Sequence, residues 1–489
     1  EKLILSYSDT NAKGEGISPA YLIGSIRSLY PKLEIKGGAG VGAGVRPHKN
    51  SINNYCYPEN PEAGIDLFLE KLVQETEKEH EDILEQADET DAVFGELYSW
   101  YLRNPEYRSR VQKLVQSAFA GKPEDIISQS VAKALYGEVS PYSATRLERF
   151  AACAFAHFLQ YGMKLTERVE YEFKPMDMGN VMHEALESFA EEVRKRGMKW
   201  TELTEQERNE IADRCLDNIV ADYGNTVLKS SARNEYMIER TRRILRRTVW
   251  ALQKQLEQGE FQPEGFEVTF GGGRIDRVDI MEDQNKVYVK VIDYKTGNTS
   301  FDLVYLYHGL QLQLMIYLDG ALRVEQKKYP DKEIIPAGVF YYNIKDPMIQ
   351  EKIDADVEAV SAGLMKELKM NGLVQADPEL VYRMDSSLGS IPVAFNKDGS
   401  FRKNSSVADR TQFAVLGRYV RTKIEKIRSS ILEGDAEVSP YELGKKNACT
   451  YCPYMTVCGF DRRLSGYEFR RLKNFSDEEL WKAFDREAE

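Results

Sequence analysis

Four cysteines in two distant places constrain this 489-residue chain more than any other feature of its sequence. Cys153 stands alone, and Cys449, Cys452 and Cys458 follow near the end with the spacing C-x2-C-x5-C. Structural zinc sites usually draw their ligands from two close pairs, whereas an iron–sulfur cluster held by four thiolates accepts irregular spacing. The spacing favours neither group over the other. In either case Cys153 is the only sensible fourth ligand, so we expect the fold to bring these four cysteines together.

The bulk composition is that of a large globular protein. Length and a hydrophobic content of 42% allow about two to four domains with real cores. No apolar run reaches the roughly 20 residues that span a bilayer, and six cysteines in so long a chain do not form a secreted disulfide scaffold. We therefore expect a cytoplasmic protein without a membrane partner. The chain begins at Glu1 without a signal-like segment, and we expect it to be a piece of a longer protein.

The net charge of −12 is unexpected for a protein that binds nucleic acid, because affinity for DNA depends on neutralising phosphates. Basic stretches occur at 240–247, 418–428 and 462–471, and each is at least as well explained as an exposed helix face. The glycine-rich stretch 37–44 lacks the Lys-Ser/Thr of a phosphate-binding loop, and the motif occurs nowhere else in the sequence. The chain by itself is therefore not expected to be an ATP-driven motor.

Hydrophobic periodicity predicts a mixed α/β organisation that changes character near residue 137. Before that point we expect a strand over 3–7, a helix over 18–30 with Ser18 as its cap, and mostly helical sequence over 65–136. The elements expected after it are helices over 144–159, 178–196 and 204–259, strands over 266–270, 274–280 and 287–294, a helix over 305–322, a strand over 337–342 and a long helix over 408–433.

Two aspartates and a lysine carry the chemistry. Asp276 and Asp293 fall on adjacent predicted strands, and alternation places Lys295 on the same face as Asp293. Such a face can hold a hard divalent cation through oxygen ligands, with an ammonium beside it to orient water or stabilise charge during phosphodiester hydrolysis. A lone Asp-x-Lys is common by chance, but Gly-x-Ile-Asp followed by Ile-Asp-Tyr-Lys-Thr-Gly is much more specific. Two strand-end aspartates in turns are the less favoured interpretation.

Three further residues are weaker candidates. His183 lies on a predicted helix upstream of the acidic pair, where it is a plausible extra metal ligand, although a lone helical histidine is usually structural. Gln313 and Tyr317 stand at i and i+4 on the helix after Lys295 and so share one face. They are able to position a phosphate or the active-site strand, and the alternative is plain packing of helix on sheet.

Together these segments resemble the iron–sulfur branch of the PD-(D/E)xK nuclease superfamily, and within it the AddB (RexB-type) subunits of bacterial AddAB helicase–nucleases. The resemblance covers about residues 140–470 in the family's order, and the combination is specific although each piece alone is not. The matching pieces are Leu147-Glu-Arg-Phe-Ala-Ala-Cys153, Gly179-Asn-Val-Met-His183, Gly273-Arg-Ile-Asp276-Arg-Val-Asp279, Val291-Ile-Asp293-Tyr-Lys295-Thr-Gly297, Gly309-Leu-Gln311-Leu-Gln313 and the three clustered cysteines with Gly459.

The resemblance implies an α/β fold with a PD-(D/E)xK (RecB-like) nuclease core, helical insertions and an iron–sulfur staple. Residues 138–489 would form this nuclease domain, and 1–137 the end of a helicase-like region. The implied site residues are magnesium ligands His183, Asp276 and Asp293; catalytic Lys295, with Gln313 and Tyr317 as the family's Gln-x3-Tyr helix; and Cys153, Cys449, Cys452 and Cys458 around a 4Fe-4S cluster. Asp279 is placed outside the site because its alternation is ambiguous.

The function implied is magnesium-dependent cleavage of single-stranded DNA, as an exonuclease, within a helicase–nuclease complex that resects double-strand breaks for recombinational repair. Its partners would be single-stranded DNA and an AddA-like subunit. Two alternatives remain open: a stand-alone iron–sulfur exonuclease, and a structural DNA-binding subunit with a silent site. The helicase-like leader and the long insertion at 197–262 argue against the first, and the intact Asp276, Asp293 and Lys295 argue against the second.

Overall fold

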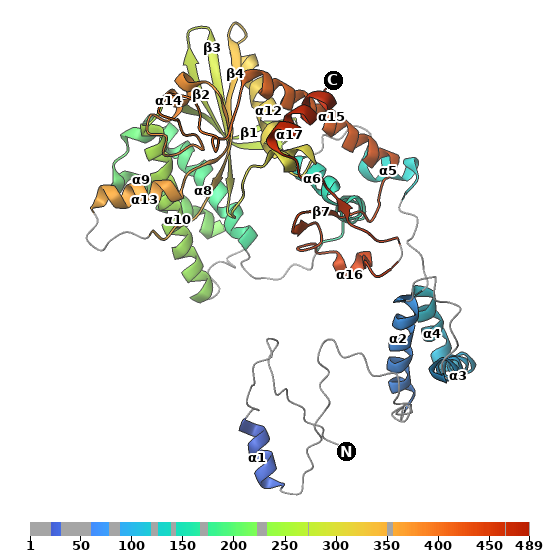
Figure 1. The fold of residues 1–489 in the computed structure, drawn as a ribbon. Helices are drawn as coiled ribbons and strands as arrows, with labels where there is room; N and C mark the ends of the chain where they lie inside the picture. Colours follow the sequence, from blue (N-terminus) through green and yellow to red (C-terminus); the bar gives the residue numbers. More distant parts are fainter. Residues whose placement is uncertain are drawn as a thin grey trace. The chain divides into compact units, whose positions relative to one another are not determined.

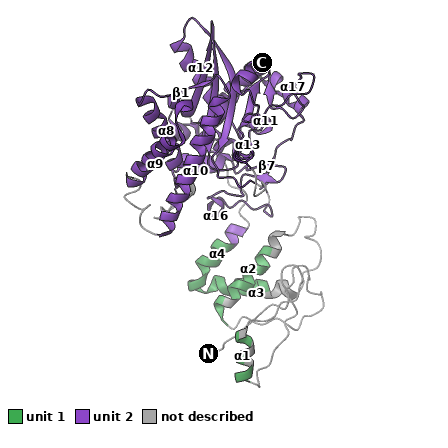
Figure 2. Ribbon diagram, turned by 90° about the vertical axis from the view of Figure 1, so that its left-hand side faces the viewer, with its two compact units in different colours: residues 1–75, 80–114 green, residues 76–79, 115–489 purple. Residues whose placement is uncertain are grey.

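The computed structural model describes residues 21–30, 60–77, 89–118, 126–137, 143–166, 175–222, 232–271, 273–349, 356–464 and 466–488. The chain divides into two compact units, one of residues 1–75 and 80–114, the other of 76–79 and 115–489 (Figure 2). The predicted strand 3–7, the cap Ser18 and the glycine-rich stretch 37–44 lie outside the described residues. That 1–137 is the end of a helicase-like region stays a prediction.

The smaller unit is helical where it is described. Its core forms around Phe68, which is fully buried and stacks on Phe94 and Tyr98 with ring centroids 4.8 and 5.7 Å away. The Tyr101 hydroxyl donates to the Pro61 carbonyl at 2.6 Å. The helical pattern expected over 65–136 is thus confirmed in the described residues. The helices are α1 (Tyr21–Leu29), α2 (Pro61–Glu77), α3 (Glu89–Arg103) and α4 (Pro105–Ala118), which continues past the unit boundary, and in the larger unit α5 (Gln129–Tyr136).

A six-stranded sheet in the order β1-β2-β3-β4-β5-β6 organises the larger unit (Figure 1). Strands β1 (Gln262–Phe270), β2 (Gly273–Asp283) and β3 (Lys286–Lys295) form an antiparallel meander. A crossover through α12 (Gln313–Lys328) then returns the chain to β4 (Glu333–Asn343), parallel to β3. These four strands confirm the expected order. The sequence did not predict β5 (Asn371–Gln375) or β6 (Val407–Ala408), which are too short to give a periodic signal.

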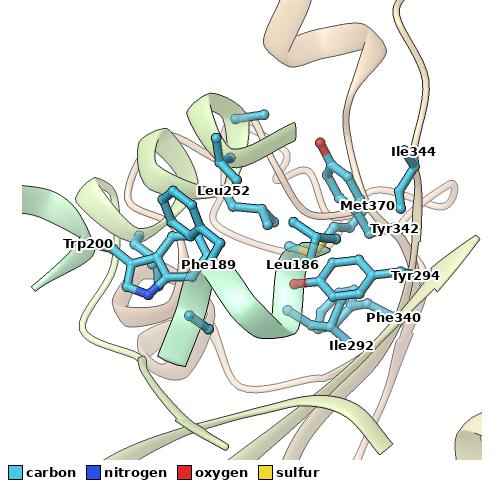
Figure 3. Packing of buried hydrophobic residues seen from close by; sticks show 14 of the residues in the cluster. Leu186, Phe189, Trp200, Leu252, Ile292, Tyr294, Phe340, Tyr342, Ile344 and Met370 are labelled. Atoms are coloured by element: carbon cyan, nitrogen blue, oxygen red, sulfur yellow. The ribbon is translucent and has the colours of Figure 1, made fainter. Parts of the chain in front are cut away.

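Each face of the sheet is covered by helices, and strict alternation along β3 explains why. Val287, Val289 and Val291 belong to one core cluster, whereas Ile292 and Tyr294 belong to the other. The second cluster is packed by α8, α10 and neighbouring segments (Figure 3), and the first by α12, α15 and α17, on the opposite side of the sheet (Figure 1). The covering helices are α6 (Ala144–Ala152), α8 (Pro175–Lys195), α9 (Glu205–Asp222), α10 (Ala232–Glu257), α15 (Arg410–Glu433) and α17 (Asp477–Ala488).

Two predicted helices are interrupted. The helix expected over 144–159 breaks at Cys153, which adopts an extended conformation (φ −165°, ψ 117°), and the Phe155 N–H donates to the distant Glu437 carbonyl. The helix expected over 305–322 breaks at Gly309, whose φ of 78° is left-handed and whose backbone lies against Ala151. Both breaks arise from tertiary contacts that local periodicity does not record.

The remaining elements are short and lie after these breaks or late in the chain. A second, three-stranded sheet has the order β8-β7-β9 and adjoins the cysteine-rich segment. The elements are α7 (Ala154–His157), a π-helix (Phe158–Gly162), a 3-10 helix (Trp200–Glu202), α11 (Leu303–Tyr307), α13 (Val357–Glu367), α14 (Pro378–Met384), β7 (Tyr441–Leu443), β8 (Lys446–Asn447), α16 (Met455–Cys458) and β9 (Arg470–Arg471).

Candidate active site and cysteine site

Three carboxylates lie in a row across the first three strands. The register places Glu267 of β1, Asp276 of β2 and Asp293 of β3 at matching positions, and all three are buried. Glu267 has a positive φ of 50°, a conformation that costs a non-glycine residue about 1–3 kcal/mol and is concentrated at functional sites. Sequence reasoning missed Glu267, because a single glutamate in a strand gains meaning only once its register with Asp276 is known.

His183 of α8 completes a candidate metal centre with two of these carboxylates. Its Nδ1 lies 3.4 Å from Asp276 Oδ2 and 3.8 Å from Glu267 Oε1, and one ligand atom from each of the three residues lies within 4.8 Å of the others. Burial lowers the pKa of His183, but the two carboxylates outweigh burial and raise it to about 10. An imidazole and two carboxylates form a donor set for a divalent cation, which would compete with the proton on His183.

Asp293 is held by the predicted catalytic residues. Lys295 Nζ lies 2.5 Å from Asp293 Oδ2, and Gln313 Nε2 donates to Asp293 Oδ1 at 2.8 Å. Gln313 also accepts from Lys295 Nζ at 2.9 Å, and its amide lies 2.9 Å from the Tyr317 hydroxyl. Burial raises the pKa of Asp293, and the charge of Asp276 raises it further. The structure therefore brings all of these predicted residues together, with Glu267 in the place beside His183 and Asp276 that was expected for Asp293.

Asp279 points to the opposite face of β2. It is fully buried and pairs with Arg277 Nε at 2.5 Å and with Lys290 Nζ at 3.0 Å. Burial raises the pKa of Asp279, but these two cations outweigh burial and hold it below its usual range. Asp279 is a structural residue of the core beneath α8 and α10.

The four predicted cysteines line one cavity of about 20 Å³, together with apolar residues that include Phe155, Tyr454 and Phe460. Cys153 is buried at the break between α6 and α7, and Cys449, Cys452 and Cys458 are half-buried in the segment that follows β8. Burial, and then the proximity of the other three thiols, raises the pKa of Cys449 to about 12. Cys215 is buried in the other core, and Cys56 lies outside the described residues.

The basic stretch of α10 is paired with acidic neighbours. Arg242 lies 2.7 Å from Asp217, and Arg243 lies 2.6 Å from Asp346. Arg246 pairs with Asp213. These arginines form an ion-pair network on the surface of the helix, as the interpretation of an exposed helix face expects. In the described part of the chain, no helix is long and apolar enough to cross a membrane.

The meander, the crossover helix and the acidic row with its lysine are features of a nuclease, and comparison with known families agrees. Residues 141–459 match the PD-(D/E)XK nuclease superfamily, so the chain belongs to that superfamily. The predicted fold class and resemblance are therefore confirmed.

The curated relatives name a particular kind of nuclease. All of the chain aligns with 42% of an ATP-dependent helicase/deoxyribonuclease subunit of Lachnoclostridium phytofermentans, at 38% identity. It aligns with 43% of the proteins of the same name from Alkaliphilus metalliredigens and Clostridium acetobutylicum, at 32% and 31% identity. The chain thus spans about two fifths of the length of these relatives.

Proposed function

We propose that this chain is the nuclease-bearing part of a helicase–deoxyribonuclease subunit and that it hydrolyses DNA phosphodiester bonds. The observation that carries the proposal is the meeting of His183, Glu267 and Asp276 beside the Asp293–Lys295 pair. The names of the relatives support DNA as the substrate class and a partner subunit as the setting. An intact lysine and four acidic or imidazole side chains speak against a silent site.

The proposed cation is magnesium, with His183, Glu267 and Asp276 as ligands and Asp293 as the neighbouring carboxylate. When bound it would polarise the phosphate and lower the pKa of a water ligand. The protein's own part is positional. Tyr294 N–H donates to Asp276 Oδ2 at 2.7 Å, which orients that carboxylate. Asp293 and Gln313 fix the Lys295 ammonium, which is then in place to orient the attacking water and to stabilise negative charge on the phosphate.

The four cysteines are proposed to hold a 4Fe-4S cluster. In the described part of the chain no three Sγ atoms lie within 4.8 Å of one another. A tetrahedral zinc ion with Zn–S bonds of about 2.3 Å would hold its thiolates about 3.8 Å apart, whereas a cubane cluster separates them because each thiolate binds a different iron. This wider arrangement around an apolar cavity supports iron–sulfur over zinc. The cluster would join the end of α6 to the C-terminal segment.

Single-stranded DNA is the proposed substrate and an AddA-like subunit the proposed partner, in a cytoplasmic complex that resects double-strand breaks. A chain of net charge −12, with the α10 arginines already paired, offers few cations for a long duplex. A single strand needs fewer phosphate contacts and also gains from stacking on aromatic side chains.

The test is cleavage of labelled single-stranded and blunt duplex DNA by the purified chain, with magnesium and with a chelator. We expect magnesium-dependent cutting of the single strand in clear preference to the duplex, and a fading preference once a helicase partner unwinds the duplex. Lys295→Ala is the inactive control. Equal rates on both substrates without a partner would favour a duplex endonuclease. Cutting by Lys295→Ala would refute the site, and binding without cutting by the wild type would favour a structural subunit.

A further inference from the structure

Glu148 of α6 reaches across to the first residues of α12. Its Oε1 accepts hydrogen bonds from the backbone N–H groups of Leu312 at 2.7 Å and Gln313 at 2.9 Å. Leu312 stands at the N-cap position of α12 and makes no side-chain cap of its own. The first N–H groups of a helix lack partners within the helix and carry partial positive charge. A carboxylate from another helix therefore completes the start of α12.

The residue fixed in this way is the one that organises the active site. Gln313 is the first residue of α12, and its side chain contacts Asp293, Lys295 and Tyr317 at 2.8–2.9 Å. Because Gln313 has so short a reach from the helix start, a shift of that start moves the amide that holds both the acid and the lysine.

The same helix ends at the cysteine site. Cys153 lies five residues after Glu148, which at 1.5 Å per residue is about 7.5 Å along the axis. The end of α6 is held from two sides. Arg470 of β9 donates to the Ala151 carbonyl, and a Cβ placed on Gly309 would lie 3.2 Å from Ala151 Cβ. About one and a half turns of helix thus connect the cysteines to the cap of α12.

We propose that Glu148 is a positioning residue for the nuclease reaction: it fixes the start of α12 and, through Gln313, the places of Asp293 and Lys295. Through α6, it also makes that geometry depend on the cysteine site. The proposal rests on the nuclease function proposed above. In this role Glu148 works as a hydrogen-bond acceptor. A glutamine at this position keeps an acceptor oxygen at the same reach, whereas alanine leaves two N–H groups without a partner.

The test compares Glu148→Ala and Glu148→Gln with Asp409→Ala in the full chain. Asp409 caps α15, where its Oδ1 accepts from the Gln412 N–H at 2.8 Å, so its loss removes a comparable cap from another helix. The readouts are kcat and KM on a single-stranded oligonucleotide with magnesium, and hydrogen exchange of the amides of 312 and 313. We expect Glu148→Ala to lose about 10- to 100-fold in kcat with little change in KM, and to exchange faster. Glu148→Gln and Asp409→Ala should resemble the wild type in both readouts.

Two results would overturn the proposal. Full activity and protection in Glu148→Ala would show that the contact is dispensable. An equal loss in Glu148→Gln would assign the effect to the charge, and so to a direct catalytic or metal-binding role. The exchange measurement separates this proposal from the nuclease function: a wild type that does not cut DNA refutes that function, while the amides still report whether Glu148 fixes the start of α12.

The dependence on the cysteine site has its own measurement. Cys153→Ser is expected to lower kcat and to speed exchange at 312 and 313, and adding Glu148→Ala should then cost little more, because both changes loosen the same helix start. Cys458→Ser, at a half-buried position, serves where Cys153→Ser does not fold. Fully additive losses, or unchanged exchange in both cysteine variants, would refute the connection through α6.

Discussion

Replacing Asp279 by asparagine tests whether the two aspartates of β2 do different work. Asp279 lies between the guanidinium of Arg277, at 2.5 and 2.9 Å, and the ammonium of Lys290, at 3.0 Å. The side chains of the three residues are at most 7% exposed. Asparagine preserves the shape but removes the negative charge between two buried cations. We therefore expect Asp279→Asn to destabilise the protein while leaving nuclease activity in place.

The size of the effect follows from burial. Removing one partner of a buried ion pair costs about 3–5 kcal/mol, because the remaining charge is left without compensation. An exposed pair such as Glu282 with Lys332, on the same strand, contributes less than about 1 kcal/mol. For a unit as long as residues 115–489, a loss of about 3–5 kcal/mol corresponds to a fall in Tm of about 4–6 °C.

The effect should also depend on pH. The pKa of Asp279 is depressed in the folded protein, so its contribution to stability is fully present above the unfolded value of about 3.9 and is lost as the pH falls toward the depressed value. The difference in Tm between the wild type and Asp279→Asn should therefore be constant near neutral pH and shrink below about pH 4.

Thermal unfolding followed by circular dichroism, together with magnesium-dependent cleavage, checks both halves of the prediction. Glu282→Gln is the matched control on β2, and we expect its Tm to stay close to that of the wild type. An Asp279→Asn protein as stable as Glu282→Gln would refute the reasoning about buried charge. A stable but inactive Asp279→Asn protein would instead place Asp279 in the active site.

The other predictions concern the two sites directly. Asp276→Ala and Lys295→Ala should abolish cleavage without changing visible absorbance, and wild-type activity in either purified variant would contradict their roles. Substituting any of Cys153, Cys449, Cys452 or Cys458 should bleach the blue absorbance and lower Tm, with iron and zinc analysis as the check. A colourless protein of undiminished stability would rule the cluster out. Burial raises the pKa of Glu148 to about 7, above the unfolded value of about 4.3, so the wild type should lose stability as the pH rises between those values. Glu148→Gln should not, and parallel Tm profiles from about pH 4 to 8 would refute this.

The strands were predictable because their signal is local. Alternation along 287–294 and the short turns around it identify the meander, and the positions of Asp276, Asp293 and Lys295 follow from it. The breaks at Cys153 and Gly309 were not predictable, because each depends on a contact with a segment far away in the sequence. The short β5 and β6 have too few residues for a period to emerge.

The candidate site divides in the same way. Residues on elements with a clear period, such as Gln313 and Tyr317 at i and i+4, were placed on one face, and the structure joins them by a contact of 2.9 Å. Glu267 was missed because its role depends on strand register. Glu148 was missed because it acts on the backbone of a distant helix, and a side chain that caps another segment leaves no periodic pattern in its own.

The ambiguity of Asp279 shows where a stronger inference was within reach. Residues 276 and 279 are an odd number of steps apart, so an unbroken strand must place them on opposite faces. The only uncertainty was a bulge between them, and the register of β2 with β3 runs without a shift from Arg277 to Asp283. The strand therefore gives Asp276 to the face of α12, with Asp293 and Lys295, and Asp279 to the face of α8 and α10. One short motif thus supplies a ligand to the proposed metal centre and a buried charge to the core that supports it.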